Sequence, residues 1–398
     1  VVDTDLVFVD NVGEVYKEVN SEKKIVSAVF KGEELPSIMK EIIGASNSVQ
    51  THVRQLWLDA IPDKIYIDEL LKKYKYTKEN FILNPVIGEY DAPELQKQDL
   101  LTLPISKGGN TIIYGMAGSG KENLLSTILY SLMISHYKEE VNVYVLDFGA
   151  EVLNSYRKSP IIGDIVTSND TEKIKNYFKF IMKEFENRKR LLQDYNGDYL
   201  YYCSKSGSTM PNILTIINNF DNYRESVNDV YDETLSKVCR EGEKYGIFFI
   251  ITCNSTNSVS YRLSQNFKQK ICLQLNDTYD YRSIFGNATR CVPANIKGRG
   301  LVEVGNVYEF QTAIPTKTDD LNEYINNVSS ELLRKSNGRA KGIQTLPEII
   351  NFEFIEPNIN TLSDIPIGVY TENLEIVKYN FLTKNFNVVS SNLFDDVV

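Results

Sequence analysis

The stretch GMAGSGKE, residues 115–122, follows the pattern of a phosphate-binding loop at every position except the last. In the pattern G-x-x-x-x-G-K-[ST], backbone N–H groups surround the phosphates, the lysine reaches the β and γ phosphates, and the final hydroxyl binds Mg²⁺. Lys121 supplies the lysine, whereas Glu122 replaces the hydroxyl, and its charge repels the phosphates unless a metal ion lies between them. The sequence predicts a phosphate site formed by Gly115, Met116, Ala117, Gly118, Ser119, Gly120, Lys121 and Glu122.

A loop that hydrolyses a nucleotide also needs two acids at the end of a neighbouring strand, an aspartate for the metal and a glutamate for the attacking water. The stretch ILTIINNFDNY offers that strand, and Asn218 and Asn219 stand at its end. An amide has no charge to hold Mg²⁺ and no basic site at neutral pH. Asp221 lies beyond the strand end. Asp147, in VLDFGAE, is a substitute that the sequence leaves open, although it ends a different strand. We therefore predict no catalytic residue and no metal ligand, weak or absent binding of ATP and Mg²⁺, and absent or very weak hydrolysis.

Alternating strands and helices must position this loop. Apolar stretches typical of buried strands cover residues 109–115, 142–149, 212–220 and 246–254, and helical patterns cover 121–136, 170–195 and 225–245. Strands and helices that alternate at this spacing predict a parallel sheet covered on both faces. The predicted fold class is α/β, a RecA-like P-loop NTPase fold in which the loop joins the first of these strands to the first helix. Before it, short apolar runs broken by Pro and Gly predict β-hairpins that lead into the sheet.

The composition is that of a globular protein and excludes several functional classes. Of the 398 residues, 42% are hydrophobic and 24% are charged. The formal net charge of −10 opposes binding to nucleic-acid phosphates, so we expect no nucleic-acid partner. Two histidines, and five cysteines without a C-x-x-C pair, argue against a zinc site and for reduced thiols. No apolar run reaches the roughly 18 residues that cross a bilayer. We expect a soluble piece of a longer polypeptide.

A series of sequence blocks runs between residues 55 and 313: LWLDAIP, VIGEYDAPELQKQ, GMAGSGKE, VYVLDFGAEVL, ENRKRLL, GIFFIITCN and VPANIKGRGLVEVGNVYEFQTA. Together they resemble the FtsK/SpoIIIE-type ATPase modules that stand in tandem in type VII (ESX) secretion proteins of the EssC and EccC kind. The family's active modules read Asp-Glu where this chain reads Asn218-Asn219. The resemblance implies a place at the cytoplasmic face of the cell membrane and a homo-oligomer of the full-length protein. The partners it implies are neighbouring ATPase modules of the same chain, other secretion-system subunits and secreted substrate proteins.

An internal repeat suggests where this module stands. The stretch PVIGEYDAPELQ, residues 85–96, has a weak echo in IPIGVYTENLEIV, residues 365–377. We interpret residues 1–54, with a helical pattern over 24–48, as the connector from a preceding module, 55–315 as the P-loop ATPase module, and 316–398 as the connector and opening strands of a following, more degenerate module. In the family's usual layout, this chain then holds the second of three modules.

Further residues have an expected role or two open interpretations. Asn254, which ends GIFFIITCN, is either a polar sensor of the γ phosphate or a capping residue at the strand end. Arg299, in KGRG, is either an arginine finger that reaches a neighbouring module or part of a turn before a strand, and we favour the turn. The basic run NRKRLL, residues 187–192, is expected to form the solvated face of a long helix.

Three functions compete for this sequence. The first is a catalytically degenerate module that holds its neighbours in register and binds exported proteins. The second is a working ATPase of a secretion motor in which Glu122 serves as an unusual metal ligand. The third is a DNA translocase, which the acidic composition opposes.

Overall fold

A computed structural model describes residues 6–19, 34–49, 58–206, 210–286, 291–345, 365–369, 375–380 and 382. The chain divides into two units, Val1–Leu56 and Trp57–Val398. In the first unit, β1 (Leu6–Val9) pairs with β2 (Val15–Val19), and α1 (Glu34–Ser48) has no buried residue. The helix expected within residues 24–48 is therefore present from Glu34, and residues 24–33 lie outside the described ranges. None of the described helices is long and apolar enough to cross a membrane.

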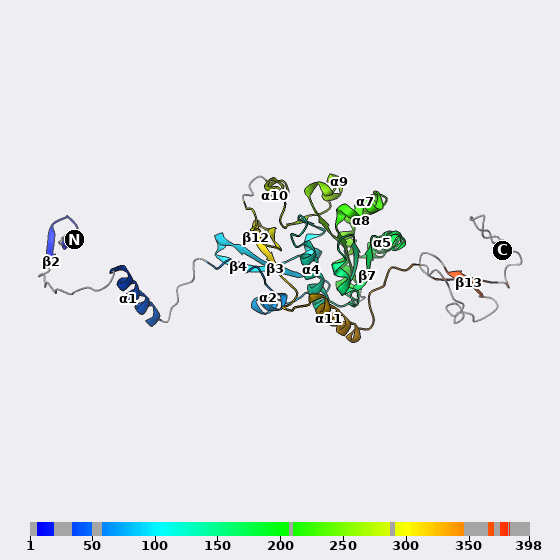
Figure 1. Cartoon of the computed structure of the whole chain (residues 1–398), viewed down its shortest axis with the longest axis horizontal. Helices are drawn as coiled ribbons and strands as arrows, with labels where there is room; N and C mark the ends of the chain where they lie inside the picture. Colours follow the sequence, from blue (N-terminus) through cyan, green and yellow to red (C-terminus); the bar gives the residue numbers. More distant parts are fainter. Residues whose placement is uncertain are drawn as a thin grey trace. The chain divides into compact units, whose positions relative to one another are not determined.

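A ten-stranded mixed sheet forms the centre of the second unit (Figure 1). Its strand order is β4-β3-β12-β11-β10-β5-β9-β8-β6-β7. The strands are β3 (Val86–Ala92), β4 (Lys97–Thr102), β5 (Thr111–Tyr114), β6 (Val141–Asp147), β7 (Ile162–Thr167), β8 (Asn212–Asn218), β9 (Ile247–Cys253), β10 (Gln269–Cys272), β11 (Arg299–Val304) and β12 (Asn306–Thr312). Strands β10, β5, β9, β8, β6 and β7 pair in parallel, which confirms the predicted α/β fold. Strands β11, β12, β3 and β4 extend the sheet in antiparallel fashion. The β3–β4 hairpin agrees with the hairpins expected before the loop, whereas the sequence did not predict the pairing of β12 with β3.

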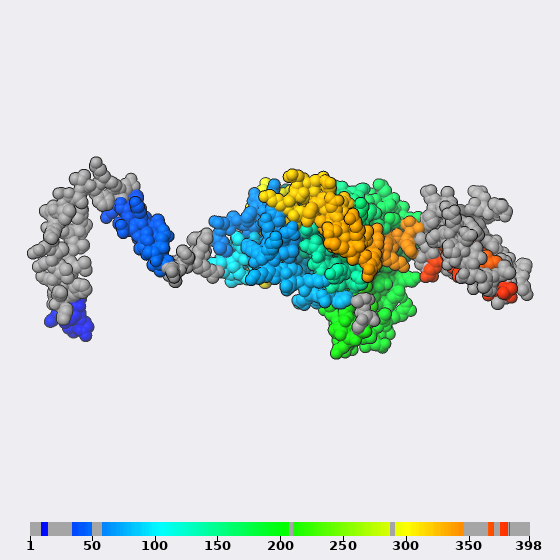
Figure 2. Space-filling view, turned by 90° about the horizontal axis from the view of Figure 1, so that it is seen from below, coloured from blue at the N-terminus to red at the C-terminus, as the bar shows by residue number. Residues whose placement is uncertain are grey.

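Helices cover both faces of the sheet and enclose two hydrophobic cores. On one face pack α2 (Ile67–Tyr74), α4 (Lys121–Ser135) and α11 (Leu321–Lys335). On the other pack α5 (Thr171–Leu191), α7 (Phe220–Val227), α8 (Asp232–Glu241), α9 (Tyr261–Ser264) and α10 (Thr278–Phe285). Figure 2 shows α11, in orange, beside the blue segment that contains α2. Because β8 and β9 are covered on both faces, all of their residues are buried and apolar runs predict them well.

Two predicted elements differ from the structure. The helix expected over residues 225–245 is two helices, because Asn228 and Asp229, with φ of 48° and 60°, interrupt it between α7 and α8. Residues 67–74 form α2 rather than a hairpin strand. Its acids, Asp68 and Glu69, lie in the first turn, and two lysines lie in the last turn, which suits the helix dipole.

The basic run 187–192 is also not wholly a solvated face, because Arg188 is buried. Its Nη1 donates to the carbonyl of Tyr245 at 2.9 Å, and its Nη2 donates to the carbonyl of Pro211 at 2.8 Å. Its Nε donates to Glu184 Oε1 at 2.8 Å. The side chain therefore ties α5 to the residues that precede β8 and β9.

The two halves of the internal repeat have the same local backbone. Strands β3 and β4 pair antiparallel, and so do β13 (Ile365–Val369) and β14 (Ile376–Tyr379). The register shifts between Val86 and Gly88 in the first hairpin and between Pro366 and Gly368 in the second. The irregularity thus falls at corresponding positions of the two sequence copies.

Candidate functional site

The predicted phosphate loop lies between the end of β5 and the start of α4, at the carboxyl edge of the parallel strands. The N–H of Gly115 donates to the carbonyl of Cys253 at 3.0 Å, and the N–H of Met116 donates to that of Gln274 at 2.7 Å. The loop is therefore fastened to the ends of two neighbouring strands. Gly120 has a φ of 105°, and a Cβ there would lie 2.9 Å from the backbone nitrogen of Gly298. Only glycine fits at this position.

Lys121 is folded into its own loop. Its buried ammonium donates to the carbonyls of Gly115 and Met116, at 2.5 Å and 3.0 Å, and to Asn254 Oδ1 at 3.0 Å. Burial lowers the pKa of this ammonium, whereas the charge of Glu122 raises it. The hydroxyl of Ser119 is buried without a partner.

The start of α4 adds further donors to this loop. The first N–H groups of a helix have no partner within the helix and favour an anion. These N–H groups suit a phosphate group, and the Lys121 ammonium, which is bonded within the loop, adds a positive charge beside them.

Both amides at the expected acidic positions are engaged inside the protein. Asn218 Nδ2 donates to Asp147 Oδ1 at 2.9 Å, and its Oδ1 accepts from the hydroxyl of Thr252 at 2.9 Å. Asn219 has a φ of 61° and its Oδ1 accepts from the N–H of Asn222, which caps α7. Each side-chain oxygen thus already accepts one hydrogen bond, that of Asn218 in the buried interior and that of Asn219, at 3.4 Å, at the start of α7.

Asp147 lies beside Asn218, a position that the sequence does not reveal. It ends a different strand from Asn218, but β6 and β8 are neighbours and the two residues are paired in register. The carboxyl group is only 1% exposed, and its Oδ2 has no hydrogen-bond partner. Burial raises its pKa, which the bonds from Asn218 and Gly149 oppose. No sequence signal identifies this pairing, because it depends on the strand order.

The other predicted residues lie around the same edge of the sheet. Asp221 lies in the first turn of α7, and its Oδ2 accepts from the N–H of Asn254 at 3.0 Å. The side-chain oxygen of Asn254 faces Lys121, so Asn254 joins the phosphate loop to α7. No group of three or more His, Cys, Asp or Glu side chains in the described part of the chain is arranged to hold a metal.

Arg299 lies inside the domain and is not placed as a finger. It is 6% exposed, and its Nε donates to Gln311 Oε1 at 2.8 Å. Its Nη2 donates to the carbonyl of Ile61 at 2.8 Å. The guanidinium therefore joins the entry of the domain to β12.

A segment against the phosphate loop was missed by the sequence analysis. We call residues 294–298 the strap. Gln274 Nε2 donates to the carbonyls of Ala294 and Ile296, both at 2.9 Å, and the N–H of Gly298 donates to the carbonyl of Ser119 at 2.8 Å. The strap is thus bonded to the loop directly and through Gln274.

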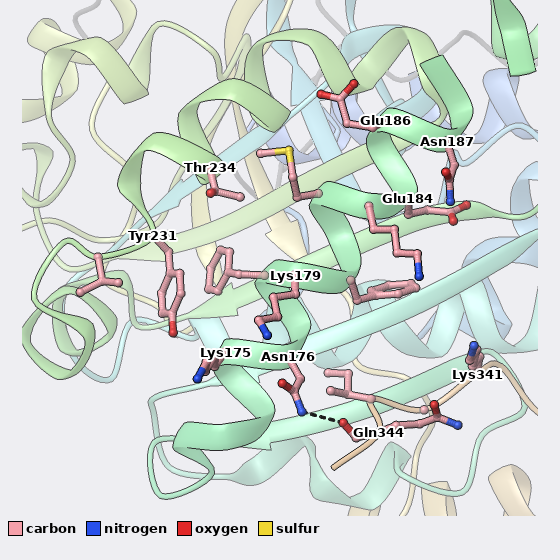
Figure 3. Close-up of a pocket in the computed structure, with 17 residues that line it drawn as sticks. Lys175, Asn176, Lys179, Glu184, Glu186, Asn187, Tyr231, Thr234, Lys341 and Gln344 are labelled. Carbon is pink, nitrogen blue, oxygen red and sulfur yellow. Dashed lines mark hydrogen bonds between the residues drawn. The ribbon is translucent and has the colours of Figure 1, made fainter. Parts of the chain in front are cut away.

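A cavity of about 830 Å³ lies apart from the phosphate loop, between α5, α8 and residues 341–344 (Figure 3). Phe178, stacked on Tyr231 with ring centroids 4.2 Å apart, contributes to its apolar wall. Lysines of α5 and Lys341 lie at its rim. Asn176 Nδ2 holds the carbonyl of Gln344 at 2.8 Å, so the chain itself runs along the cavity.

Comparisons with known proteins agree with this fold and loop. Residues 84–277 match the model of the FtsK/SpoIIIE family. The type VII secretion system protein EssC of Staphylococcus aureus (strain MRSA252) is 24% identical over 368 residues, which cover 88% of this chain and 25% of that protein. The chain thus spans about a quarter of the length of the curated relatives it matches first.

Solved structures show the same architecture. EssC (ATPases 2 and 3) from Geobacillus thermodenitrificans gives a TM-score of 0.73 at 25% identity, covering 82% of this chain and 63% of that one. Thermomonospora curvata EccC (ATPases 2 and 3), in complex with a signal sequence peptide, gives 0.63 at 23% identity, covering 77% and 57%. The chain is therefore similar to the FtsK/SpoIIIE-type ATPase domains of the type VII secretion proteins EssC and EccC, and residues 84–277 match that family's model.

Proposed function

We propose that this domain is a catalytically degenerate module of a type VII secretion motor, which binds an anion or a nucleotide weakly and serves a structural and regulatory role. One observation carries the proposal: the amides of Asn218 and Asn219 stand where the acids are needed, and both are engaged in internal hydrogen bonds. Loss of a general base lowers a rate about 10²- to 10⁴-fold, and loss of metal stabilisation costs several kcal/mol more. With Glu122 in place of the hydroxyl, turnover falls to near background.

The wider setting of the module belongs to the same proposal. Residues 55–315 are the second of three modules, between a connector at 1–54 and the start of a following module at 316–398. The relatives and the matching bulges of the two hairpins support this layout. Its partners are neighbouring modules, other secretion subunits and secreted proteins, in a homo-oligomer at the cytoplasmic face of the cell membrane.

Calorimetric titration tests the loss of metal-dependent chemistry. We expect ATP to bind with a dissociation constant in the high micromolar range or weaker, roughly −5 kcal/mol, and equally in Mg²⁺ and in EDTA. Lys121 and the loop remain to hold phosphates, whereas the metal-binding hydroxyl is replaced by Glu122 and the two acids are replaced by amides. Tight ATP binding that requires Mg²⁺ contradicts the proposal.

A specific observation favours the alternative, an active ATPase. Asp147 Oδ2 is a buried carboxylate oxygen without a partner beside Asn218, and Mg²⁺ is often held by one or two carboxylates together with phosphate oxygens. Asp147 and Glu122 would then be the ligands. If Mg²⁺-dependent binding is found and is lost in Asp147→Asn, this alternative replaces the degenerate module.

The α5/α8 cavity is the surface we propose for the secreted partner. Its apolar wall, and its lysines, which outnumber Glu184 and Glu186 in the lining, suit an acidic amphipathic peptide, and the EccC structure contains a signal sequence peptide. We expect a photo-crosslinker at Val230, 71% exposed in the cavity lining, to capture a protein exported by the same system in intact cells. The matched position is Val304, 41% exposed on β11. Equal capture from both positions speaks against this surface.

A further inference from the structure

We infer that Lys297, on the strap, is a second phosphate-binding side chain that acts where the site lacks a metal ion, so that the ligand is a metal-free polyphosphate such as a nucleoside diphosphate. The inference rests on the proposed function, in which the metal ligands are lost. Lys297, which lies outside the loop pattern, would then neutralise part of the phosphate charge.

The strap holds Lys297 in a fixed place beside the loop. On one side, the N–H of Gly298 donates to the carbonyl of Ser119 at 2.8 Å. On the other, Gln311 Nε2 donates to the carbonyl of Lys297 at 3.1 Å, and Gln311 Oε1 is held by Arg299. Arg299 is thus a positioning residue for the strap. These bonds restrict the backbone at Lys297, so a ligand has to order only the side chain.

The side chain of Lys297 lies against the start of α4. A Cβ on Gly120 would lie 3.5 Å from Lys297 Cγ, so the lysine stem crosses the residue that precedes Lys121. Lys297 is exposed, and the described residues give its ammonium no ion pair or hydrogen bond. The group is therefore available to an anion at the first N–H groups of the helix.

The charges of the loop explain why a second lysine is needed. Glu122 places a negative charge beside Lys121, so these two residues together contribute no net charge to the phosphate site. An ammonium at 297 restores a net positive charge, which in other phosphate sites is supplied in part by Mg²⁺. The unpartnered hydroxyl of Ser119, 1% exposed inside the loop, adds a further polar group that a phosphate oxygen can satisfy.

The experiment is a titration of the chain with ADP and with inorganic pyrophosphate in EDTA at low salt. Lys297→Gln is expected to weaken both affinities about tenfold, the loss of one charge-assisted hydrogen bond. Lys297→Arg is expected to retain most of the affinity. The matched control is Lys158→Gln, which removes an exposed lysine between β6 and β7, outside the loop and the strap, and is expected to change neither affinity more than about twofold.

Each outcome separates this inference from the proposed function. If Lys297→Gln and Lys158→Gln behave alike, or if the wild-type chain binds neither probe in EDTA, Lys297 has no such role. If binding requires Mg²⁺, both this inference and the proposed degenerate site are wrong. If binding does not require Mg²⁺ and is lost in Lys121→Ala but not in Lys297→Gln, the role of Lys297 is wrong and the proposed function stands. Circular dichroism and thermal melts of each variant confirm that the fold is intact.

Discussion

A quadruple variant is expected to bind nucleotide in a Mg²⁺-dependent manner. It combines Glu122→Thr and Asn219→Glu with an exchange of the acid and the amide, Asp147→Asn and Asn218→Asp. The sequence alone suggests a simpler repair, the triple variant Glu122→Thr, Asn218→Asp and Asn219→Glu. The structure argues against that version, because Asn218 Nδ2 lies 2.9 Å from Asp147 Oδ1. A second carboxylate there would face a buried like charge, which favours protonation of one of the two.

The readout of the repair is ATP affinity in Mg²⁺ divided by affinity in EDTA. We expect a ratio of at least about ten in the quadruple variant, a smaller one in the triple variant and near unity in single variants, because groups that serve one metal act together. Asn219 has a φ of 61°, so Glu at this position costs about 1–2 kcal/mol of stability and lowers the melting temperature. A folded quadruple variant with a ratio of one would show that the acidic strand is misassigned.

Arg188→Ala is expected to lower the free energy of unfolding by at least about 3 kcal/mol, because it removes a buried donor from several acceptors at once. The guanidinium, 3% exposed, serves the carbonyls of Tyr245 and Pro211 and the carboxylate of Glu184. Without it, those buried groups lose their partner and a cavity remains.

Chemical denaturation, followed by circular dichroism, measures this effect. The matched variant is Arg190→Ala in the same basic run, whose exposed guanidinium donates to Asn187 Oδ1. We expect it to change the free energy of unfolding by less than about 0.5 kcal/mol. Similar midpoints for the two alanine variants contradict the structural role of Arg188.

The parallel half of the sheet and the phosphate loop could be predicted because their determinants are local. Strands buried on both faces read as apolar runs, and the loop joins a strand and a helix that are adjacent in sequence. The pairing of β12 with β3 could not be predicted, since these strands lie more than half of the domain apart in the sequence. Sequence patterns do not state which distant strands meet.

The candidate site divides in the same way. Lys121, Glu122, Asn218 and Asn219 were identified from spacing alone. The contact of Asp147 with Asn218 was not, because it requires the order of β6 and β8. The sequence predicts a solvated Arg188 because a run of basic residues does not indicate which side chain turns toward the segments before β8 and β9.

The bulged hairpins described above differ in the space beside one glycine. A Cβ on Gly88 would lie 2.0 Å from the carbonyl oxygen of Gln311 on β12, so the absence of a side chain is what lets β12 come close. Gly368 holds the corresponding position, yet no described atom lies within 4 Å of a Cβ there. Ile367 is 58% exposed, whereas Ile87 is fully buried. Among the described residues, the second hairpin thus keeps the clearance that in the first hairpin admits a third strand, and we expect a strand to add at this position.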